Sequence, residues 1–149
     1  MPIVYMLIGV PGSGKSTWAK DTDLPIASSD DWVEELSRRQ GLTYTEGFRA
    51  NIEAATEHMY RTVRGLVEAE QDFIWDQTNL SSFARMQKLS KIPDSYRTIA
   101  VYFPTPEREE LERRLAQRTD KQIPMDVIDS MMKNIEAPTL DEFDVIITI

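Results

Sequence analysis

The chain has 149 residues, of which 41% are hydrophobic, and a formal net charge of −8 at pH 7. This length supports one well-buried core and is short for two, so we expect a single domain over residues 1–149. The absence of cysteine excludes a disulfide framework and a thiolate zinc site. We see no apolar run of membrane-spanning length and no secretory leader, and we therefore expect a cytoplasmic protein.

Apolar strand-like runs alternate with helical patterns along the chain, which is typical of a parallel sheet covered by helices on both faces. The predicted strands are Ile3–Ile8, Pro25–Ser28, Phe73–Asp76, Thr98–Phe103 and Val145–Ile149. The predicted helices lie between them, at about residues 15–21, 30–40, 47–70, 82–91, 106–118 and 125–136. Ligands of such sheets bind outside the carboxyl ends of the strands, so polar residues just past these ends are the first candidates for chemistry.

The first predicted strand runs directly into a phosphate-binding loop. Residues 9–17 read GVPGSGKST, a complete match to the Walker A pattern G-x-x-x-x-G-K-[ST]. In this pattern backbone N–H groups close around phosphate oxygens, the lysine neutralises the β- and γ-phosphates, and the serine ligates Mg²⁺. The residues predicted to bind a nucleoside triphosphate are Gly12, Ser13, Gly14, Lys15, Ser16 and Thr17, with the metal on Ser16.

Two aspartates, Asp30 and Asp31, follow the second predicted strand. An aspartate at a helix start can cap free backbone N–H groups, and we expect one of the two to do so. A kinase that phosphorylates a hydroxyl also needs a carboxylate that accepts the hydroxyl proton. We interpret Asp30 as this general base, with a purely structural role as the alternative.

Asp76 ends the third predicted strand. In phosphate-loop enzymes an acid at this place usually orders Mg²⁺, directly or through water. The alternative is a helix cap, which the following serines, Ser81 and Ser82, already provide. We therefore predict that Asp76 is a metal ligand, while Thr78 and Asn79 are candidates to position either Asp76 or the acceptor.

The predicted helix at residues 106–118 carries arginines on the face that otherwise turns inward. This face is formed by Leu111, Arg114, Leu115 and Arg118. The polar segment 119–124 ends at a proline suited to a helix start, and we predict that it is a lid. Arg118, with Arg114 behind it, then stabilises negative charge on the transferring phosphoryl group. The alternative for Arg114 is a surface ion pair with Glu110 at i, i+4 spacing.

Four segments together resemble the kinase domain of bacteriophage polynucleotide 5′-hydroxyl kinase and its relatives. They read GVPGSGKSTW at 9–18, SDD at 29–31, DQTNL at 76–80 and ELERRLAQRTDKQIPMDVIDSM at 110–131. The resemblance implies a P-loop NTPase fold of the adenylate-kinase-like type. Such a fold is a three-layer α/β sandwich with a five-stranded parallel sheet and helices on both faces.

The same resemblance implies a function in nucleic acid end repair, in the cytoplasm of a phage-infected host cell. Lys15, Ser16 and Thr17 would bind ATP and Mg²⁺, and Asp30 would take the 5′-hydroxyl proton. Arg118 would contact the donor phosphates, and Arg114 also matches a family arginine in position. The implied activity is transfer of the γ-phosphate of ATP to the 5′-hydroxyl end of a DNA or RNA strand.

The acceptor is the open part of this prediction. The family has an arginine that holds the acceptor 3′-phosphate where this chain has Val33, and candidates to replace it are Arg38, Arg39 and Arg49. The net charge of −8 also disfavours tracking along a nucleic acid, because that affinity needs a basic face. The alternative acceptor is a small-molecule hydroxyl, on a nucleoside, metabolite or antibiotic.

Two further expectations concern aromatic residues and a third class of function. Trp32, Tyr44 and Phe48 are candidates to stack on an end base, whereas the lone His58 is expected on the surface. A nucleotide-dependent switch is disfavoured, because neither the D-x-x-G nor the N-K-x-D element of GTPases occurs.

Overall fold

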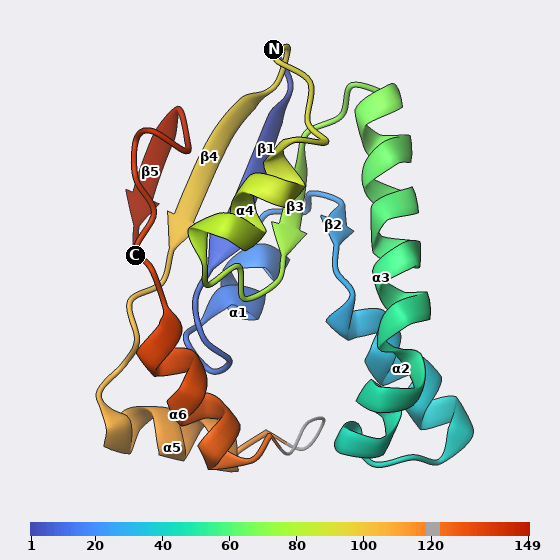
Figure 1. The fold of residues 1–149 in the computed structure, drawn as a ribbon, viewed down its shortest axis with the longest axis vertical. Coiled ribbons are helices and arrows are strands. Elements are labelled where there is room, and N and C mark those ends of the chain that lie inside the picture. The colour runs from blue at the N-terminus through green and yellow to red at the C-terminus, as the bar shows by residue number, and fades with distance from the viewer. Residues whose placement is uncertain (119–122) are drawn as a thin grey trace.

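The computed structural model describes residues 1–118 and 123–149. Within these ranges five parallel strands form one sheet in the order β2-β3-β1-β4-β5 (Figure 1). The strands are β1 Ile3–Ile8, β2 Ile26–Ala27, β3 Phe73–Asp76, β4 Arg97–Tyr102 and β5 Val145–Thr148. The helices are α1 Lys15–Lys20, α2 Asp30–Gln40, α3 Tyr44–Glu68, α4 Ser82–Leu89, α5 Arg108–Ala116 and α6 Met125–Asn134.

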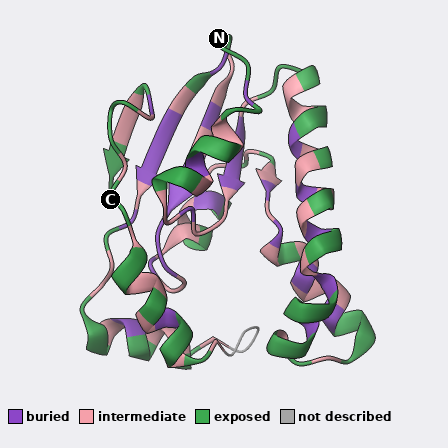
Figure 2. Cartoon of the chain, in the orientation of Figure 1, coloured by how far each residue is buried: buried purple, intermediate pink, exposed green. Residues whose placement is uncertain are grey.

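Helices cover both faces of this sheet, as predicted. On one face Met6 and Trp75 pack with Met59 of α3, and on the other Leu7 and Ile74 pack with Ala19 of α1. Adjacent residues of a strand point to opposite faces, so the continuous apolar run of β1 fills both layers. Figure 2 shows the central strands buried between helices with exposed outer surfaces. The predicted α/β three-layer class is therefore confirmed.

The largest boundary difference is at the start of α3, which begins at Tyr44 rather than at residue 47. Thr43 is its N-cap: the Thr43 hydroxyl accepts a hydrogen bond from the Glu46 backbone N–H at 3.3 Å and donates one to the Glu46 carboxylate at 2.7 Å. This reciprocal pairing is a capping box. It adds a turn to the helix that the apolar periodicity alone did not indicate, and this turn carries Tyr44.

The remaining differences are smaller. The strand β2 holds two residues instead of the four predicted, and α5 ends at Ala116, which leaves Arg118 beyond the helix. None of the helices in the two described ranges has both the length and the apolar character that crossing a membrane requires.

The carboxyl ends of β1, β2 and β3 lie at the same edge of the sheet, since the three strands are parallel neighbours. Below this edge α5 and α6 lie on one side and α2 on the other (Figure 1). Val10 of the loop after β1 is fully buried against Leu111 of α5 and Ile128 of α6. The edge that carries the candidate motifs is thus bounded by helices from both halves of the chain.

Candidate phosphotransfer site

The loop between β1 and α1 has a backbone that only glycine allows. Gly12 and Gly14 have φ values of 85° and 107°, which side chains rarely adopt. A Cβ at Gly12 would also lie 3.0 Å from the Leu111 side chain of α5. The Lys15 ammonium donates to the carbonyl oxygens of Gly9 and Val10, at 2.7 and 3.3 Å, so it lies across the loop. Ser16 follows it as an exposed residue of α1.

Asp76 lies beside this loop, on the neighbouring strand. It pairs in register with Leu7 of β1, two residues before Gly9. The segment after it is tied to the loop, because the Gly9 N–H donates to the Thr78 carbonyl at 3.0 Å. Ser16 and Asp76 offer a hydroxyl and a carboxylate oxygen, the ligands that Mg²⁺ prefers. The two predicted metal ligands therefore come from adjacent segments at one edge.

Asn79 has a structural role in this arrangement. Its side chain is 2% exposed, and its amide donates to the Leu7 carbonyl at 2.7 Å. The Lys88 ammonium of α4 donates to the Asn79 Oδ1. We predicted Asn79 as a candidate to position Asp76 or the acceptor, and the structure shows that its amide group links α4 to the central strand.

Asp30 is the first residue of α2 and is half-buried. We expected one of the two aspartates to cap this helix, but the Ser28 hydroxyl accepts from the Asp31 N–H at 3.3 Å. The Ser29 carbonyl in turn accepts from the Val33 N–H at 2.9 Å. Ser28 and Ser29 therefore accept these two backbone N–H groups at the start of α2. The Asp30 carboxylate accepts a hydrogen bond from the Tyr44 hydroxyl, at 3.3 Å.

Three charged side chains, those of Asp30, Glu34 and Arg118, act on the Tyr44 hydroxyl. Burial and the Asp30 carboxylate raise the pKa of the Tyr44 hydroxyl far above its ordinary value of 10.0, with a smaller contribution from Glu34. Arg118 acts on the same hydroxyl in the opposite direction. The cation predicted to contact the donor phosphates therefore lies within electrostatic reach of the Tyr44–Asp30 pair. Sequence reasoning treated Tyr44 only as a stacking aromatic and missed this contact.

A second link joins neighbouring strand ends. The Gln77 amide, after β3, donates to the Ser29 hydroxyl, after β2, at 2.6 Å. The loop after β3 is therefore hydrogen-bonded to the phosphate-binding loop through Thr78 and to the Asp30 segment through Gln77. Nothing in the local sequence signalled this connection, because the two residues lie 48 positions apart.

Arg114 forms the ion pair with Glu110 that was the alternative interpretation, and it also contacts the phosphate-binding loop. Its Nε donates to the Glu110 carboxylate at 2.8 Å, and its Nη1 donates to the Gly12 carbonyl of the phosphate-binding loop at 3.1 Å. Arg118 is half-buried just past α5, where its N–H donates to the Leu115 carbonyl at 3.2 Å. The predicted lid covers residues 119–124, of which 119–122 lie outside the described residues.

The structure corrects one expectation about the rings near α2. The indole of Trp32 stacks on the imidazole of His58, with centroids 4.3 Å apart and planes 8° apart. His58 is therefore half-buried between helices, not a surface residue. The same contact covers one face of the half-buried Trp32 ring. Phe48 lies 6.1 Å from the Tyr44 ring and is 39% exposed, so it stays available for contact.

The arginine candidates for an acceptor phosphate also have defined places. Val33 is fully buried, so its position faces the interior. Arg38 and Arg39 pair with Glu35 on the surface of α2, and their side chains are 73% and 63% exposed. Arg49 is an exposed residue of α3. The structure therefore brings none of these three arginines into a described contact with Asp30.

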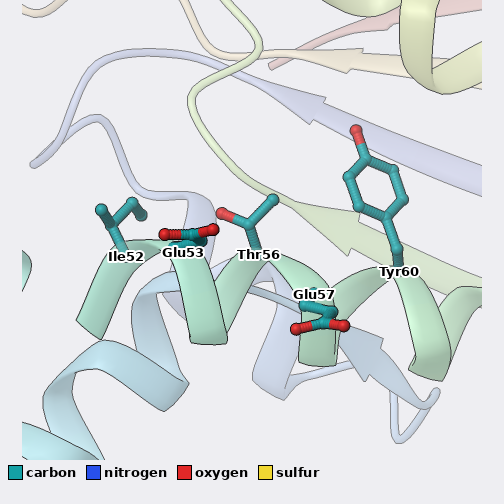
Figure 3. A pocket seen from close by; sticks show the side chains of 5 residues that line it. All are labelled: Ile52, Glu53, Thr56, Glu57 and Tyr60. Carbon is teal, nitrogen blue, oxygen red and sulfur yellow. The ribbon is translucent and has the colours of Figure 1, made fainter.

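An open hollow of about 440 Å³ lies along α3 (Figure 3). Its lining residues are Ile52, Glu53, Thr56, Glu57 and Tyr60. Ile52, Thr56 and Tyr60 follow one another at four-residue spacing, so adjacent members of this row are neighbours on the helix surface. Two carboxylates, of Glu53 and Glu57, border this hollow. No sequence pattern indicated this hollow.

A phosphate-binding loop after the central strand of a five-stranded parallel sheet defines this chain as a P-loop protein with the kinase fold. The chain belongs to the AAA domain family AAA_33, a P-loop kinase family, whose model matches residues 4–138.

Solved kinases share the fold. A candidate kinase from Chloroflexus aurantiacus J-10-fl is 21% identical with a TM-score of 0.73, covering 99% of this chain and 84% of that one. A sugar kinase from Janibacter sp. HTCC2649 is 21% identical with a TM-score of 0.63, covering 100% and 85%. A chain of the Pnkp1/Rnl/Hen1 RNA repair complex is 24% identical with a TM-score of 0.68, covering 89% of this chain and 43% of that one.

Proposed function

We propose that this chain transfers the γ-phosphate of ATP to the 5′-hydroxyl end of a DNA or RNA strand. The observation that carries the proposal is the half-buried Asp30 carboxylate, which follows β2 and accepts a hydrogen bond from the Tyr44 hydroxyl of α3. The strand before Asp30 neighbours the strand that ends at Asp76, and this strand neighbours the one that leads to the phosphate-binding loop. A proton acceptor and a phosphate site at one edge are the two requirements of hydroxyl phosphorylation.

Each proposed role follows from the chemistry of the side chain. Lys15 offsets charge on the β- and γ-phosphates, and Ser16 and Asp76 hold Mg²⁺, which offsets further phosphate charge when bound. Asp30 accepts the proton of the acceptor hydroxyl as the hydroxyl oxygen forms the new bond to the γ-phosphorus. The bond to the bridging oxygen breaks, and ADP leaves. Arg118 stabilises negative charge on the phosphoryl group during this transfer.

The choice of a strand end as acceptor rests on the four segments that resemble polynucleotide 5′-hydroxyl kinases. The fold likeness to a chain of an RNA repair complex agrees with it. The exposed ring of Phe48, one turn from Tyr44, is a suitable stacking surface for an end base. Stacking contributes about 1–3 kcal/mol per base and needs no basic groove.

A second candidate acceptor is a small polyol or other small alcohol, and specific observations favour it. Val33 is buried where an acceptor-phosphate arginine would be needed, and the chain carries a net charge of −8. Both features are unfavourable for a polyanion. Similar folds occur in a sugar kinase, a gluconokinase and a shikimate kinase.

An acceptor screen with γ-labelled ATP separates the two candidates. Single-stranded DNA and RNA oligonucleotides with 5′-hydroxyl ends are compared with nucleosides, sugars and sugar acids. We expect label on the oligonucleotides. Label on a small alcohol and none on any oligonucleotide would replace the first candidate with the second.

The role of Asp30 is tested by Asp30→Asn, with Asp31→Asn as the matched control on the adjacent, exposed residue. Loss of a general base lowers turnover by about 10²- to 10⁴-fold, so we expect kcat to fall in that range for Asp30→Asn alone. Equal turnover in the two variants would show that Asp30 is not the base.

A further inference from the structure

We propose that Tyr44 is a positioning residue that holds the Asp30 carboxylate in the orientation needed for proton transfer. The inference rests on the proposed role of Asp30. It goes beyond that role because Tyr44 lies on a different helix and matches no part of the motifs. Its basis is the hydrogen bond from the Tyr44 hydroxyl to Asp30 Oδ1, across the α2–α3 contact.

The location of Asp30 explains why such a partner is needed. Asp30 is the first residue of α2, where the carboxylate is attached by two rotatable bonds and is only half-buried. A donor on one carboxylate oxygen fixes the rotation of the whole group. Catalytic groups must be held within about 0.5 Å of their productive geometry, which the side chain alone does not ensure. At 3.3 Å the bond is long, as catalytic hydrogen bonds often are before substrate binds.

The charges around the hydroxyl keep Tyr44 in the donor form. Burial and Asp30 raise its pKa, and Glu34 of α2 adds to this effect. Arg118, which enters from the end of α5, opposes it without cancelling it. Tyr44 therefore remains protonated at neutral pH and donates to the ionised carboxylate. A donor to the ionised form makes that form more stable.

The contact between α2 and α3 fixes the position of Tyr44 itself. Gly47, one turn after Tyr44, lies so close to α2 that a Cβ there would be 2.5 Å from the Ser37 Cβ. The Asn51 amide donates to the Gln40 side chain at 2.9 Å, and Trp32 stacks on His58. Three contacts along the two helices thus leave the Tyr44 hydroxyl little freedom relative to Asp30.

The test is Tyr44→Phe, which removes one hydroxyl and keeps the ring. The matched control is Tyr5→Phe, at a half-buried tyrosine of β1 that packs beside Trp18 of α1. We expect about a five- to tenfold lower kcat for Tyr44→Phe, with the KM for ATP unchanged. In an Asp30→Asn background, Tyr44→Phe has no further effect on kcat.

A spectroscopic readout keeps this test separate from the proposed function. The ¹³C signal of the Asp30 carboxyl, assigned by its loss in Asp30→Asn, is compared between variants by NMR at neutral pH. Its chemical shift changes in Tyr44→Phe, where the carboxylate has lost a hydrogen-bond donor, and not in Tyr5→Phe, whichever acceptor the enzyme uses. An unchanged chemical shift in Tyr44→Phe, or additive losses of kcat in the double variant, would overturn the positioning role. Full activity of Asp30→Asn would instead count against the proposed function.

Discussion

The ammonium group of Lys88, a half-buried residue of α4, is hydrogen-bonded to the segment after β3. It donates to Asn79, whose amide donates to the Leu7 carbonyl of β1. Burial lowers the pKa of Lys88 from its ordinary value of 10.5 to about 8. The protonated group therefore costs the folded state free energy that the unfolded chain does not bear.

This shift gives a stability that depends on pH. Above about pH 8 the folded protein loses the Lys88 proton, while the unfolded chain keeps it up to about 10.5, so the unfolded state binds more protons in this window. The free energy of unfolding then rises with pH. Denaturant unfolding of the wild type and Lys88→Met measures the effect. Between pH 8 and 10 we expect the wild type to gain about 1–3 kcal/mol relative to the variant. A pH-independent difference would contradict the assigned burial.

Individual residues were predictable where the backbone pattern itself is the signal. The order of strand, glycine loop and helix follows from residues 3–20, and the structure has it there. The contacts of Asp30 and Ser29 were not predictable in this way, because their partners Tyr44 and Gln77 lie 14 and 48 positions away. Such pairs depend on how α2, α3 and β3 are packed, which no local pattern records.

The contact between α2 and α3 depends on one glycine within a helix. Gly47 is buried, and an added Cβ would lie 1.7 Å from the Ser37 hydroxyl oxygen and 2.5 Å from the Ser37 Cβ. Rotation of the Ser37 side chain moves its hydroxyl but not its Cβ. A larger residue at position 47 must therefore separate the helices.

Gly47→Ala should destabilise the protein although alanine favours helices by about 1 kcal/mol. Overpacking costs about 1–3 kcal/mol, which exceeds that gain. The matched control is Gly65→Ala in the same helix, where nothing lies within 4 Å of an added Cβ. This control should stabilise by about 0.4–1 kcal/mol. Chemical denaturation measures both, and a stabilising Gly47→Ala would show that the helices part without cost.

Helices and strands were predicted well where apolar runs are long. They were predicted less well where polar residues set the boundary of the element. β1 and β3 have the predicted boundaries because their continuous apolar runs are buried on both faces. The start of α3 was misplaced because a capping box at Thr43, and not periodicity, begins that helix. The hollow on α3 is lined by residues from successive turns, so it forms only once the helix is assembled.

The whole molecule carries a net charge of −8, which bears on how a nucleic acid would be held. The two arginines Arg38 and Arg39 on α2 share the Glu35 carboxylate, and those on α5 pair with neighbouring acids. A strand end would therefore meet few unpaired cations among these helices. Binding through one or two phosphates and a stacked base fits this charge distribution.

The salt dependence of the KM for an oligonucleotide follows from this count. Each phosphate contact to a single strand contributes a slope of about −0.7 in log affinity against log salt concentration. For one or two contacts, the KM should rise by about three- to sevenfold between 50 and 200 mM salt. Steady-state kinetics at fixed ATP measures it, with a neutral small alcohol as control. A rise of a hundredfold or more would mean a basic groove that this charge distribution does not offer.

The strand order has a consequence for the reaction distance. β3 lies between β1, which carries the phosphate-binding loop, and β2, which leads to Asp30. Two strand spacings, about 10 Å, therefore separate the starting points of the two segments. The loop after β3 is hydrogen-bonded to both, through Thr78 and Gln77. In the proposed reaction, the loop after β3 thus sets the distance between the segment that binds the donor and the segment that carries Asp30. Substrate binding does not have to establish this distance.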